Sequence, residues 1–524
     1  MTGILNPAIN QRSDSWFCSI ETLSIVKRKG TFSLQIILAG FNLDFETIKE
    51  VKAALPGADH LTPETVSAAY ARISRNPLPV NELRDIARHE VEKSRKSNQS
   101  IVFDMGHSSI AEHAVFNIDV IGVSRFIVEE IEKFRLCSYT EKSQRYIRLE
   151  DDFVVPEEVR KAALETPFVE MIHKQNRFYQ ELYESLRANI FDTHQELAEE
   201  PKNRSMLEGW AKEDARYVIS LATESQLGMT LNARNLELML RRCAAHSLTE
   251  VRGYGRKLYD VTKSIAPSLV RYTEATEFDR KTKDNLSVQS RVMREKYGPK
   301  ESSSRAPMER DHNVTLLHVT PEADSKIVAS LTYSSSDMPM EECMRIVSLM
   351  DNEEKRDVIK TALRHMKPYD PPLREFEHVG LHYEMVVSAS CFAQLKRHRM
   401  ATLVSQGYDP ALGVTMPPSV SEVGMQDRFI EVMKQTEDTY THIKRIAPLA
   451  APYILTNAHR KRVTIKVNAR ELYHISRLRE DSFAQWDIRQ TAERMVRLGK
   501  RHMPLTLMLA TGKDSFNSLY ENVF

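Results

Sequence analysis

The chain contains EHAVFNIDVIGVSRFIVEEIEKFR at residues 112–135 and, in a similar order of residue types, EHVGLHYEMVVSASCFAQLKRHR at 377–399. In both stretches a Glu-His pair is followed by alternating apolar and polar residues, the pattern of a half-buried strand. A helix-compatible segment follows and ends in basic residues. The numbering offset between the stretches is 265 at their glutamates, Glu112 and Glu377, and 264 at their final arginines, Arg135 and Arg399.

A second pair of motifs follows in the same order. TLNARNLELMLRR (230–242) matches KVNARELYHISRLR (466–479), now with a numbering offset of 236 between Asn232 and Asn468. Two motif pairs in one order predict two copies of one domain, rather than two unrelated helical domains that share Asn-Ala-Arg by coincidence. The stretch between the motifs is longer in the first half. We expect its extra residues in the charged, helix-compatible region around 160–205.

Composition excludes several classes of protein. The 524 residues include 73 Lys plus Arg and 72 Asp plus Glu, so a net charge of +1 argues against a globally basic nucleic-acid binder. No apolar run approaches the ~20 residues of a membrane span. The N-terminal sequence predicts no signal peptide. Five scattered cysteines without a CxxC motif favour a reducing, cytoplasmic location.

A polar stretch divides the chain. Residues 277–312 are almost wholly polar and predict a linker or surface excursion, because they cannot bury enough apolar area to offset their ordering entropy. Ser482, with Gln485 three residues later, predicts the start of the last long helix. The expected division is an N-terminal tail at 1–30, a first domain at 31–276, the linker at 277–312 and a second domain at 313–524.

The motifs of common cofactor sites are absent. No GxGxxG or GxxxxGK[ST] occurs, so a Rossmann dinucleotide site or a P-loop is unsupported. HSSIAEH (107–113) superficially suggests a metal site, but its spacing fits neither HExxH nor HxxEH. We predict no metal, and a structural or cofactor-edge role for this segment.

Two basic segments are candidate ligand contacts. KFRLCSYTEKSQRY (133–146) packs cations, hydroxyls and a Glu into fourteen residues, and QLKRHRMATLVSQGYDP (394–410) contains Arg-His-Arg. Guanidinium groups match phosphates and pyrimidine carbonyls. Either segment alone is more typical of a solvated helix end favoured by the helix dipole.

Together, these segments resemble the flavin-dependent thymidylate synthases, twice over. That family's signature reads RHRxxSxxxxSxRY, preceded by GHxxxxEH and followed by A-R…N-A-R and A-Q-W-[DE]-I-R. The first half has GHSSIAEH (106–113), KFRLCSYTEKSQRY, Ala215-Arg216 and Asn232-Ala233-Arg234; the second has FEHVGLHYE, QLKRHR, NARELYHISRLR and AQWDIR (484–489). The resemblance spans about 31–270 and 313–515.

The departures from the signature are complementary. The second half keeps signature residues that the first half lacks: Arg397 and His398 where the first has Lys133 and Phe134, Gln394 where it has Glu130, and Arg479 where it has Cys243. The first half in turn keeps Ser143, Arg145 and Arg216, where the second has Gly407, Asp409 and Pro452. In the family, one subunit lends the Arg-His-Arg, the glutamine and the late arginine, and another lends the Glu-x-Ser-x-Arg strip. We therefore infer a fused pseudo-dimer with one complete composite site.

The resemblance implies an α+β fold of two tandem thymidylate-synthase-complementing-type domains, each a curved, mainly antiparallel sheet flanked by helices. It implies reductive methylation of dUMP to dTMP, with FAD as cofactor and NADPH and methylenetetrahydrofolate as co-substrates. It also implies a homodimer that forms a pseudo-tetramer of four domains. No nucleic-acid or membrane partner is expected.

The implied site residues fall into two sets. FAD would contact Arg397, His398, Arg399, Asn468, Arg470, His474, Glu141, His107 and Ser109. The nucleotide would contact Gln394, Arg397, Glu141, Ser143, Gln144, Arg145, Arg216 and Arg479. Arg479 is the expected electrostatic catalyst. Ser143 is a candidate nucleophile, although substrate hydrogen bonding is favoured because no His or Asp is placed by sequence to activate it.

Alternatives remain open. One is carbon-5 methylation or hydroxymethylation of another pyrimidine nucleotide, because Lys133, Phe134 and Thr140 depart from the signature. Another is a non-catalytic flavin- or nucleotide-binding protein on the same scaffold. A nucleic-acid binder using KRHR (396–399) and HRKR (459–462) is disfavoured by the near-zero net charge and the lack of interleaved aromatic residues.

Overall fold

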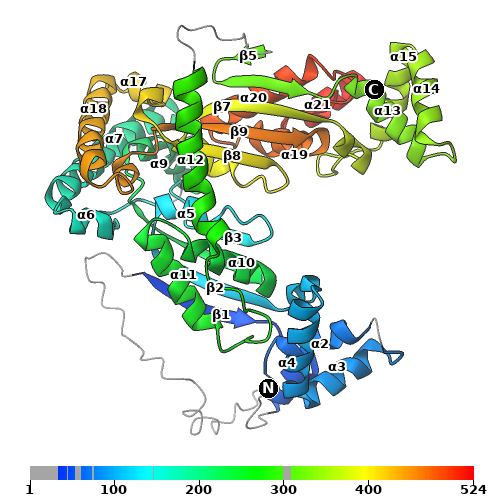
Figure 1. Ribbon diagram of the computed structural model, residues 1–524. Coiled ribbons are helices and arrows are strands. Elements are labelled where there is room, and N and C mark those ends of the chain that lie inside the picture. The colour runs from blue at the N-terminus through cyan, green and yellow to red at the C-terminus, as the bar shows by residue number, and fades with distance from the viewer. Residues whose placement is uncertain (1–33, 44, 54–60, 74–75, 146, 299–308) are drawn as a thin grey trace, which may run out of the picture.

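The structure is a computed structural model that describes residues 34–43, 45–53, 61–73, 76–145, 147–298 and 309–524. The predicted tail at 1–30 lies outside the described residues, as do Tyr146 of the signature and residues 299–308 of the linker. Two antiparallel sheets lie one above the other in Figure 1. This confirms the predicted α+β class.

Each half of the chain contributes one sheet. The first has strand order β1-β2-β4-β3, and the second has β5-β6-β7-β9-β8. The strands of the first sheet are β1 Gln35–Phe41, β2 Val115–Ser124, β3 Ser138–Glu141 and β4 Glu224–Asn232. Those of the second are β5 Glu309–Asp311, β6 Val314–Val319, β7 Gly380–Ser388, β8 Thr402–Tyr408 and β9 Arg460–Asn468.

Helices flank both sheets. Those of the first half are α1 Phe45–Lys52, α2 Glu64–Ile73, α3 Val80–His89, α4 Val91–Gln99, α5 Arg125–Ile131, α6 Glu157–Lys161, α7 Glu165–Thr193, α8 Gln195–Glu199, α9 Pro201–Ala215, α10 Ala233–Ala244 and α11 Thr249–Thr262. After α12 Glu277–Tyr297, those of the second half are α13 Ala323–Ser334, α14 Met340–Leu349, α15 Asn352–Leu363, α16 Ala389–Leu395, α17 Pro418–Glu422, α18 Gln426–Ile446, α19 Ala469–Arg479, α20 Trp486–Lys500 and α21 Phe516–Val523. Short turns are η1 Ser100–Asp104, η2 Ser108–His113, η3 Arg216–Val218, η4 Arg374–His378, η5 Pro410–Leu412 and η6 Ala451–Ile454.

The repeated motifs adopt the same structure in the two halves. Val115 of β2 lies opposite Asn232 of β4, and the matching Gly380 of β7 lies opposite Asn468 of β9. Both asparagines cap the helix that follows, accepting a backbone N–H three residues on. Strand, register and cap therefore repeat together.

The same correspondence gives the Glu-His pairs a structural role. Glu112 forms an ion pair with Arg234, the arginine of Asn-Ala-Arg, in the first half. Glu377 pairs with Arg470 at 3.2 Å in the second. The two motifs of each half, far apart in sequence, are thus tied to each other at one end of the sheet.

A β-bulge explains why the repeat offset falls by one between the Glu-His pairs and the final arginines. The register of β2 against β4 shifts between Ile121 and Val123, where Gly122 has a φ of 75°. β7 pairs with β9 without a shift. One extra residue is therefore accommodated in the first half by a left-handed backbone conformation that glycine adopts readily.

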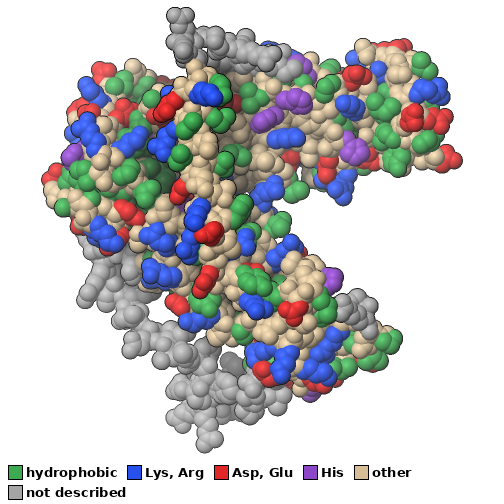
Figure 2. Space-filling model, in the orientation of Figure 1, with side chains coloured by type: hydrophobic (Ala, Val, Ile, Leu, Met, Phe, Trp, Pro, Cys, Tyr) green, Lys and Arg blue, Asp and Glu red, His purple; other side chains and the backbone are tan. Residues whose placement is uncertain are grey.

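Two sequence expectations need refinement. The polar stretch after residue 276 begins as α12, a helix with a capping box from Thr276 and Asp279 and no buried residue. Figure 2 shows hydrophobic side chains among charged ones along this helix. The expected start of the last long helix at Ser482 is wrong: Gln485 is the cap of α20, because its own side chain accepts the N–H of Ile488.

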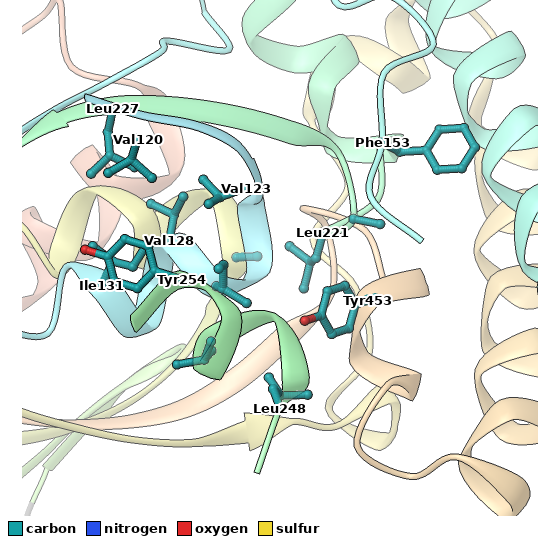
Figure 3. Packing of buried hydrophobic residues seen from close by; sticks show 14 of the residues in the cluster. Val120, Val123, Val128, Ile131, Phe153, Leu221, Leu227, Leu248, Tyr254 and Tyr453 are labelled. Carbon is teal, nitrogen blue, oxygen red and sulfur yellow. The ribbon is translucent and has the colours of Figure 1, made fainter. Parts of the chain in front are cut away.

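The extra residues of the first half lie where they were expected. The charged region forms α7, which has 29 residues against 21 in α18, together with α8 and α9. α7 packs against α18, and one hydrophobic core contains residues of both halves. Figure 3 shows Tyr453 of the second half beside Leu221 of the first.

The halves meet about an internal pseudo-twofold axis. Ser220 forms an antiparallel bridge with Thr456, the residue 236 positions later, which is its repeat equivalent. The flanking backbone bonds occur in symmetric pairs: Leu221 N to Leu455 O and Asn457 N to Ile219 O, then Ala222 N to Tyr453 O and Ala458 N to Tyr217 O. This reciprocity is the mark of an isologous interface, here formed within one chain.

Substitution of Gly122 tests the bulge. We expect Gly122→Ala to lower the free energy of unfolding by about 1–2 kcal/mol, because a Cβ disfavours positive φ. Gly253→Ala is the matched control: it lies inside α11 with open space where a Cβ would stand, so the change should be neutral or stabilising by up to about 1 kcal/mol. Urea unfolding measures both, and an unaffected Gly122→Ala would contradict the assignment of strain.

Candidate active site

A cavity of about 250 Å³ lies between the two halves. Its lining residues are Arg125, Glu141, Lys142, Ser143, Gln144, Arg145, Arg216, Ser390, Ala393, Gln394, Arg397, Asn457 and Arg479. The first half contributes the end of β3, the loop after it and η3; the second contributes α16 and the end of α19. All eight residues expected to hold a nucleotide line this one cavity.

Three guanidinium groups in the cavity are held by specific neighbours. Arg397 donates to Glu141 at 2.9 Å, joining the two halves directly. Arg216 donates to Ser390 Oγ at 3.0 Å, again across the halves. Arg479 donates to the backbone oxygen of Gln394 at 3.2 Å.

Arg145 is placed by two further groups. Its Nε forms an ion pair with Glu213, and its Nη2 donates to the Phe483 carbonyl at 3.2 Å. Burial raises the pKa of Glu213, although Arg145 and Arg216 oppose this. The loop that carries Arg145 is therefore anchored to α9 of its own half and to the segment before α20.

The cavity is strongly cationic. Burial lowers the pKa of Arg479 to about 10, and neighbouring Arg397 and Arg145 contribute. Burial also lowers the pKa of Arg216. Burial opposes ionisation of Glu141, but Arg125 and Arg397 outweigh it and lower its pKa, so Glu141 stays charged. Such an arrangement favours an anionic ligand.

Arg125 is a lining residue that the family signature does not reveal. It is 3% exposed, and its Nε lies 3.7 Å from Glu141. Its Nη1 and Nη2 have no hydrogen-bond partner among the described residues. It lies outside the signature, and its repeat equivalent in the second half is Ala389, so no motif marked it.

Asn457 escaped sequence reasoning for another reason. Its amide donates to Gln144 Oε1 at 3.0 Å and to the Arg216 carbonyl at 2.9 Å, so it orients two cavity residues from across the pseudo-twofold axis. Its repeat equivalent is Leu221. Only the packing of the two halves brings Asn457 to the cavity.

Ser143 has the surroundings of a binding residue. Its Oγ accepts the backbone N–H of Arg145 at 3.2 Å. Within the described chain, neither His nor Asp is among its hydrogen-bond partners. The geometry offers no general base for a nucleophilic serine.

The predicted flavin-side residues divide into three positions. Arg397 and Arg399 line a cavity of about 150 Å³ with Glu132, Ser138, Tyr139 and Lys396, next to the larger one, with which it shares Arg397. Arg399 donates to the carbonyls of Arg135 and Cys137 across the interface, and Arg135 donates to Ala401 O in the symmetric position.

His398 lies behind this cavity. It accepts a bond from Arg479 at 3.0 Å and contacts His474 edge to face at 5.7 Å. Burial, with Arg479 and His474 contributing, holds its pKa well below the ordinary value, so the ring is neutral. Its Nδ1 lies 3.5 Å from Glu471 Oε1, and both atoms lack a hydrogen-bond partner in the described chain.

The remaining predicted residues are occupied or distant. Asn468 caps α19, and Arg470 donates to Pro372 O and pairs with Glu377. His107 and Ser109 line a separate cavity of about 500 Å³ that shares no lining residue with either of the others. A single chain therefore does not bring these two residues to the candidate site.

A buried charge network joins the halves beside the cavity. Lys396 pairs with Glu132 at 2.8 Å, and Lys461 pairs with Glu129 at 3.0 Å. Arg397 also reaches Glu132, at 3.5 Å. Glu132 and Lys396 are repeat equivalents, 264 positions apart. A symmetric homodimer has the same residue at both positions, so this attraction requires two different halves.

Aromatic side chains stand at part of the mirror-image position. Tyr408 stands where the first half has Gln144, and Phe126 where the second half has Ser390. Tyr408 donates to the buried Glu129 at 2.5 Å, Lys461 lies 4.3 Å from the centre of its ring, and Phe126 contacts it at 6.4 Å. Aromatic groups thus replace Gln144 and Ser390, whereas the equivalents of Gln394, Arg397 and Arg479 line a separate cavity of about 460 Å³ that contains Glu130, Lys133 and Cys243.

Within the described ranges, the structure contains no cluster of three or more His, Cys, Asp or Glu that would suit a metal ion. None of the described helices is long and apolar enough to cross a membrane.

The fold and site define a tandem α+β protein with an arginine-lined pocket between its halves. The family model described as "Thymidylate synthase complementing protein" matches residues 58–268 and 315–505, so the chain belongs to this family. The two matched regions correspond to the two halves, which confirms the resemblance and the tandem arrangement.

The relatives include proteins that match one half and proteins that match both. A flavin-dependent thymidylate synthase of Clostridium tetani is 30% identical over 40% of this chain and 82% of its own length. A UPF0159 protein of Thermoplasma acidophilum is 25% identical over 82% of this chain and 91% of its own. A UMP/dUMP methylase structure from Streptomyces cacaoi, bound with 5-Br dUMP, is 18% identical and covers 45% of this chain and 93% of that one, with a TM-score of 0.31.

Charge reversal tests the network. We expect Lys396→Glu to lower the free energy of unfolding by about 3–5 kcal/mol, because it buries like charges and leaves Glu132 unpaired. The double change Glu132→Lys with Lys396→Glu should recover part of the loss, since Arg397 would still face a cation.

Lys263→Glu is the control, at the exposed pair with Asp260, and should leave the urea midpoint nearly unchanged. If Lys396→Glu leaves the free energy of unfolding unchanged, or if the double variant is no more stable than the single one, the pair does not hold the halves together.

Proposed function

We propose that the chain is a flavin-dependent thymidylate synthase that converts dUMP to dTMP at one composite site. The observation that carries the proposal is the convergence of all eight expected nucleotide-binding residues on one cavity, although they come from both halves of the chain. Family membership supports a pyrimidine-nucleotide methyltransferase.

The cavity residues have distinct proposed roles. Arg145 and Arg216, which the first half supplies, and Arg397 of the second would hold the dianionic phosphate. Gln144 and Gln394 would form directional hydrogen bonds with the nucleotide. Ser143 would also form a hydrogen bond with it and would not act as a nucleophile. Proximity of these groups fixes the orientation of the ring before reaction.

Arg479 is the proposed electrostatic catalyst. It is largely buried and donates a hydrogen bond to neutral His398, so its guanidinium group is held in one orientation in a low-dielectric site. A preorganised cation there would stabilise negative charge that develops on the uracil ring. Methylenetetrahydrofolate is the proposed carbon donor.

The neighbouring residues fit the anionic part of a flavin nucleotide. Arg397 and Arg399 present guanidinium groups to the adjoining cavity, and the buried Nδ1 of His398 is without a hydrogen-bond partner among the described residues. His474 contacts the His398 ring, and Asn468 caps the helix that carries His474, α19. Bound FAD would supply the redox chemistry, with NADPH as the reductant.

His107 and Ser109 stay predictions as flavin contacts. Because one chain keeps them in a separate cavity, any such contact would come from a second chain. This is consistent with the proposed homodimer of four domains.

The repeat supplies matched controls for binding. We expect Arg397→Ala to weaken dUMP binding roughly 10- to 150-fold, the loss of a charge-assisted contact, whereas Lys133→Ala, at the equivalent position of the other half, should change it little. Isothermal titration calorimetry should also give one dUMP per chain, because the mirror position has Lys133, Pro452 and Cys243 where the cavity has Arg397, Arg216 and Arg479.

Two dUMP molecules per chain, or equal losses in the two variants, would contradict the single composite site. Tritium release from carbon-5-labelled dUMP that requires folate and reductant tests the activity itself. Turnover of another pyrimidine nucleotide, but not of dUMP, would favour the alternative substrate; binding without turnover would favour a binding protein.

Arg125 is a proposed substrate ligand that the signature does not contain. Arg125 lines the cavity and two of its nitrogens are buried without a hydrogen-bond partner among the described residues, so we expect Arg125→Met to raise the KM for dUMP at least tenfold. Arg125→Lys should raise KM less, because it retains charge. If Arg125 only balances Glu141, both variants should lose stability in urea without a selective rise in KM.

A further inference from the structure

A second arginine-lined cavity, larger than the nucleotide cavity, plays no part in the proposed reaction. It has a volume of about 770 Å³ and lies among the start of β9, α20 and the loop at 411–416. None of its lining residues belongs to the nucleotide cavity. Its size lies within the range of small-molecule sites.

Three arginines line this cavity: Arg460, Arg462 and Arg494. Arg462 pairs with Glu384 at 3.1 Å. Among the described residues, neither Arg460 nor Arg494 has a carboxylate within ion-pair distance; they donate to neutral groups, of Thr415 and Gln490 among others. The cavity therefore carries excess positive charge.

One acidic group, Asp487, also lines the cavity and offsets part of this charge. Asp487 accepts bonds from Ser388 at 2.5 Å and Tyr217 at 3.0 Å, and burial raises its pKa, which those bonds and Arg460 oppose. Both bonds are to Oδ2 of Asp487, and within the described chain Asp487 forms no ion pair with an arginine.

The fold does not require these cations. The repeat equivalents of Arg460, Arg462 and Arg494 are Glu224, Gln226 and Leu258, on β4 and α11 of a half with the same sheet register. Because only the second half has these arginines, they are not needed to form the scaffold that both halves share. The nucleotide cavity likewise contains residues that only one half has.

The cavity also has a flat, apolar wall. Trp486 lines it, stacked on Tyr217 with ring centroids 5.8 Å apart, and its Nε1 donates to Asp214 at 2.8 Å. Leu412 and Met416 line the same space. Rigid aromatic and apolar surface beside guanidinium groups suits a ligand with a planar ring and phosphates.

A buried chain of hydrogen bonds joins the two cavities. Gln394 of the nucleotide cavity donates to Gln485 at 3.3 Å, Gln485 donates to Tyr217 at 2.8 Å, and Tyr217 donates to Asp487, which lines the larger cavity. Four side chains thus connect one wall to the other without a gap.

We propose that the larger cavity binds a nucleoside triphosphate, and that the Gln485–Tyr217–Asp487 chain couples its occupancy to dUMP binding. The arginines would hold the phosphates, and the apolar wall would hold the base. The coupling rests on the proposed function; the binding of the triphosphate does not.

Binding is tested by calorimetry on the full chain already saturated with dUMP. We expect ATP or dTTP to bind once per chain and inorganic tripolyphosphate to bind more weakly. The double variant Arg460→Gln with Arg494→Gln should weaken triphosphate binding at least tenfold. Arg445→Gln, an exposed arginine at the end of α18, is the control and should bind as the unaltered chain does.

Two outcomes would overturn the binding proposal. One is the absence of triphosphate binding at millimolar concentration. The other is tripolyphosphate that binds as tightly as the nucleotides, which would leave an anion site only. Both are independent of dUMP turnover, so failure here is distinguishable from failure of the proposed function.

Coupling is tested by titrating dUMP with and without the triphosphate. We expect the triphosphate to change the dUMP dissociation constant about fivefold or more. Tyr217→Phe, which removes both bonds of its hydroxyl, should abolish the change while retaining triphosphate binding. Asp487→Asn provides a second variant if Tyr217→Phe does not fold. A full change in both variants would overturn the coupling.

Discussion

The ion pair between Glu132 and Lys396 is the contact on which the two-half architecture depends. Equivalent residues face each other near a twofold axis, so in a symmetric dimer they would carry the same charge and repel. Here they attract at 2.8 Å in a buried setting. Separation of the pair would leave an uncompensated buried charge, which is far more costly than the pair itself. The interface therefore requires that the two halves have different residues at these equivalent positions.

The same asymmetry decides where ligands can bind. Glu129, Glu132 and Glu141 of the first half meet Lys396, Arg397 and Lys461 of the second. On one side of the axis the arrangement leaves an arginine-lined cavity; on the other, Tyr408 stands at the position of Gln144 and bonds Glu129. One chain thus has an arginine-lined pocket on one side of the axis and an aromatic contact on the other.

Much of the fold and site could be predicted from local patterns. Strand alternation and the Asn-Ala-Arg motifs predict β7, β9 and α19 correctly, because these depend on neighbouring residues. The start of α20 is harder to place: both Ser482 and Gln485 can cap a helix, and only the packing selects Gln485. The exposed helix α12 has the polarity of a linker, which hides its capping box.

The sequence by itself determined that the chain has two copies of one scaffold and that their motif losses are complementary, because the order and spacing of the motifs can be read directly from the sequence. Tertiary structure alone decided that these sets meet within one chain, that Arg125 and Asn457 join them, and that His107 lies elsewhere. The physical reason is that local periodicity is set by residues a few positions apart. The site depends on side chains far apart in the sequence, such as Glu141 and Arg397, 256 positions apart, which are brought together by one interface.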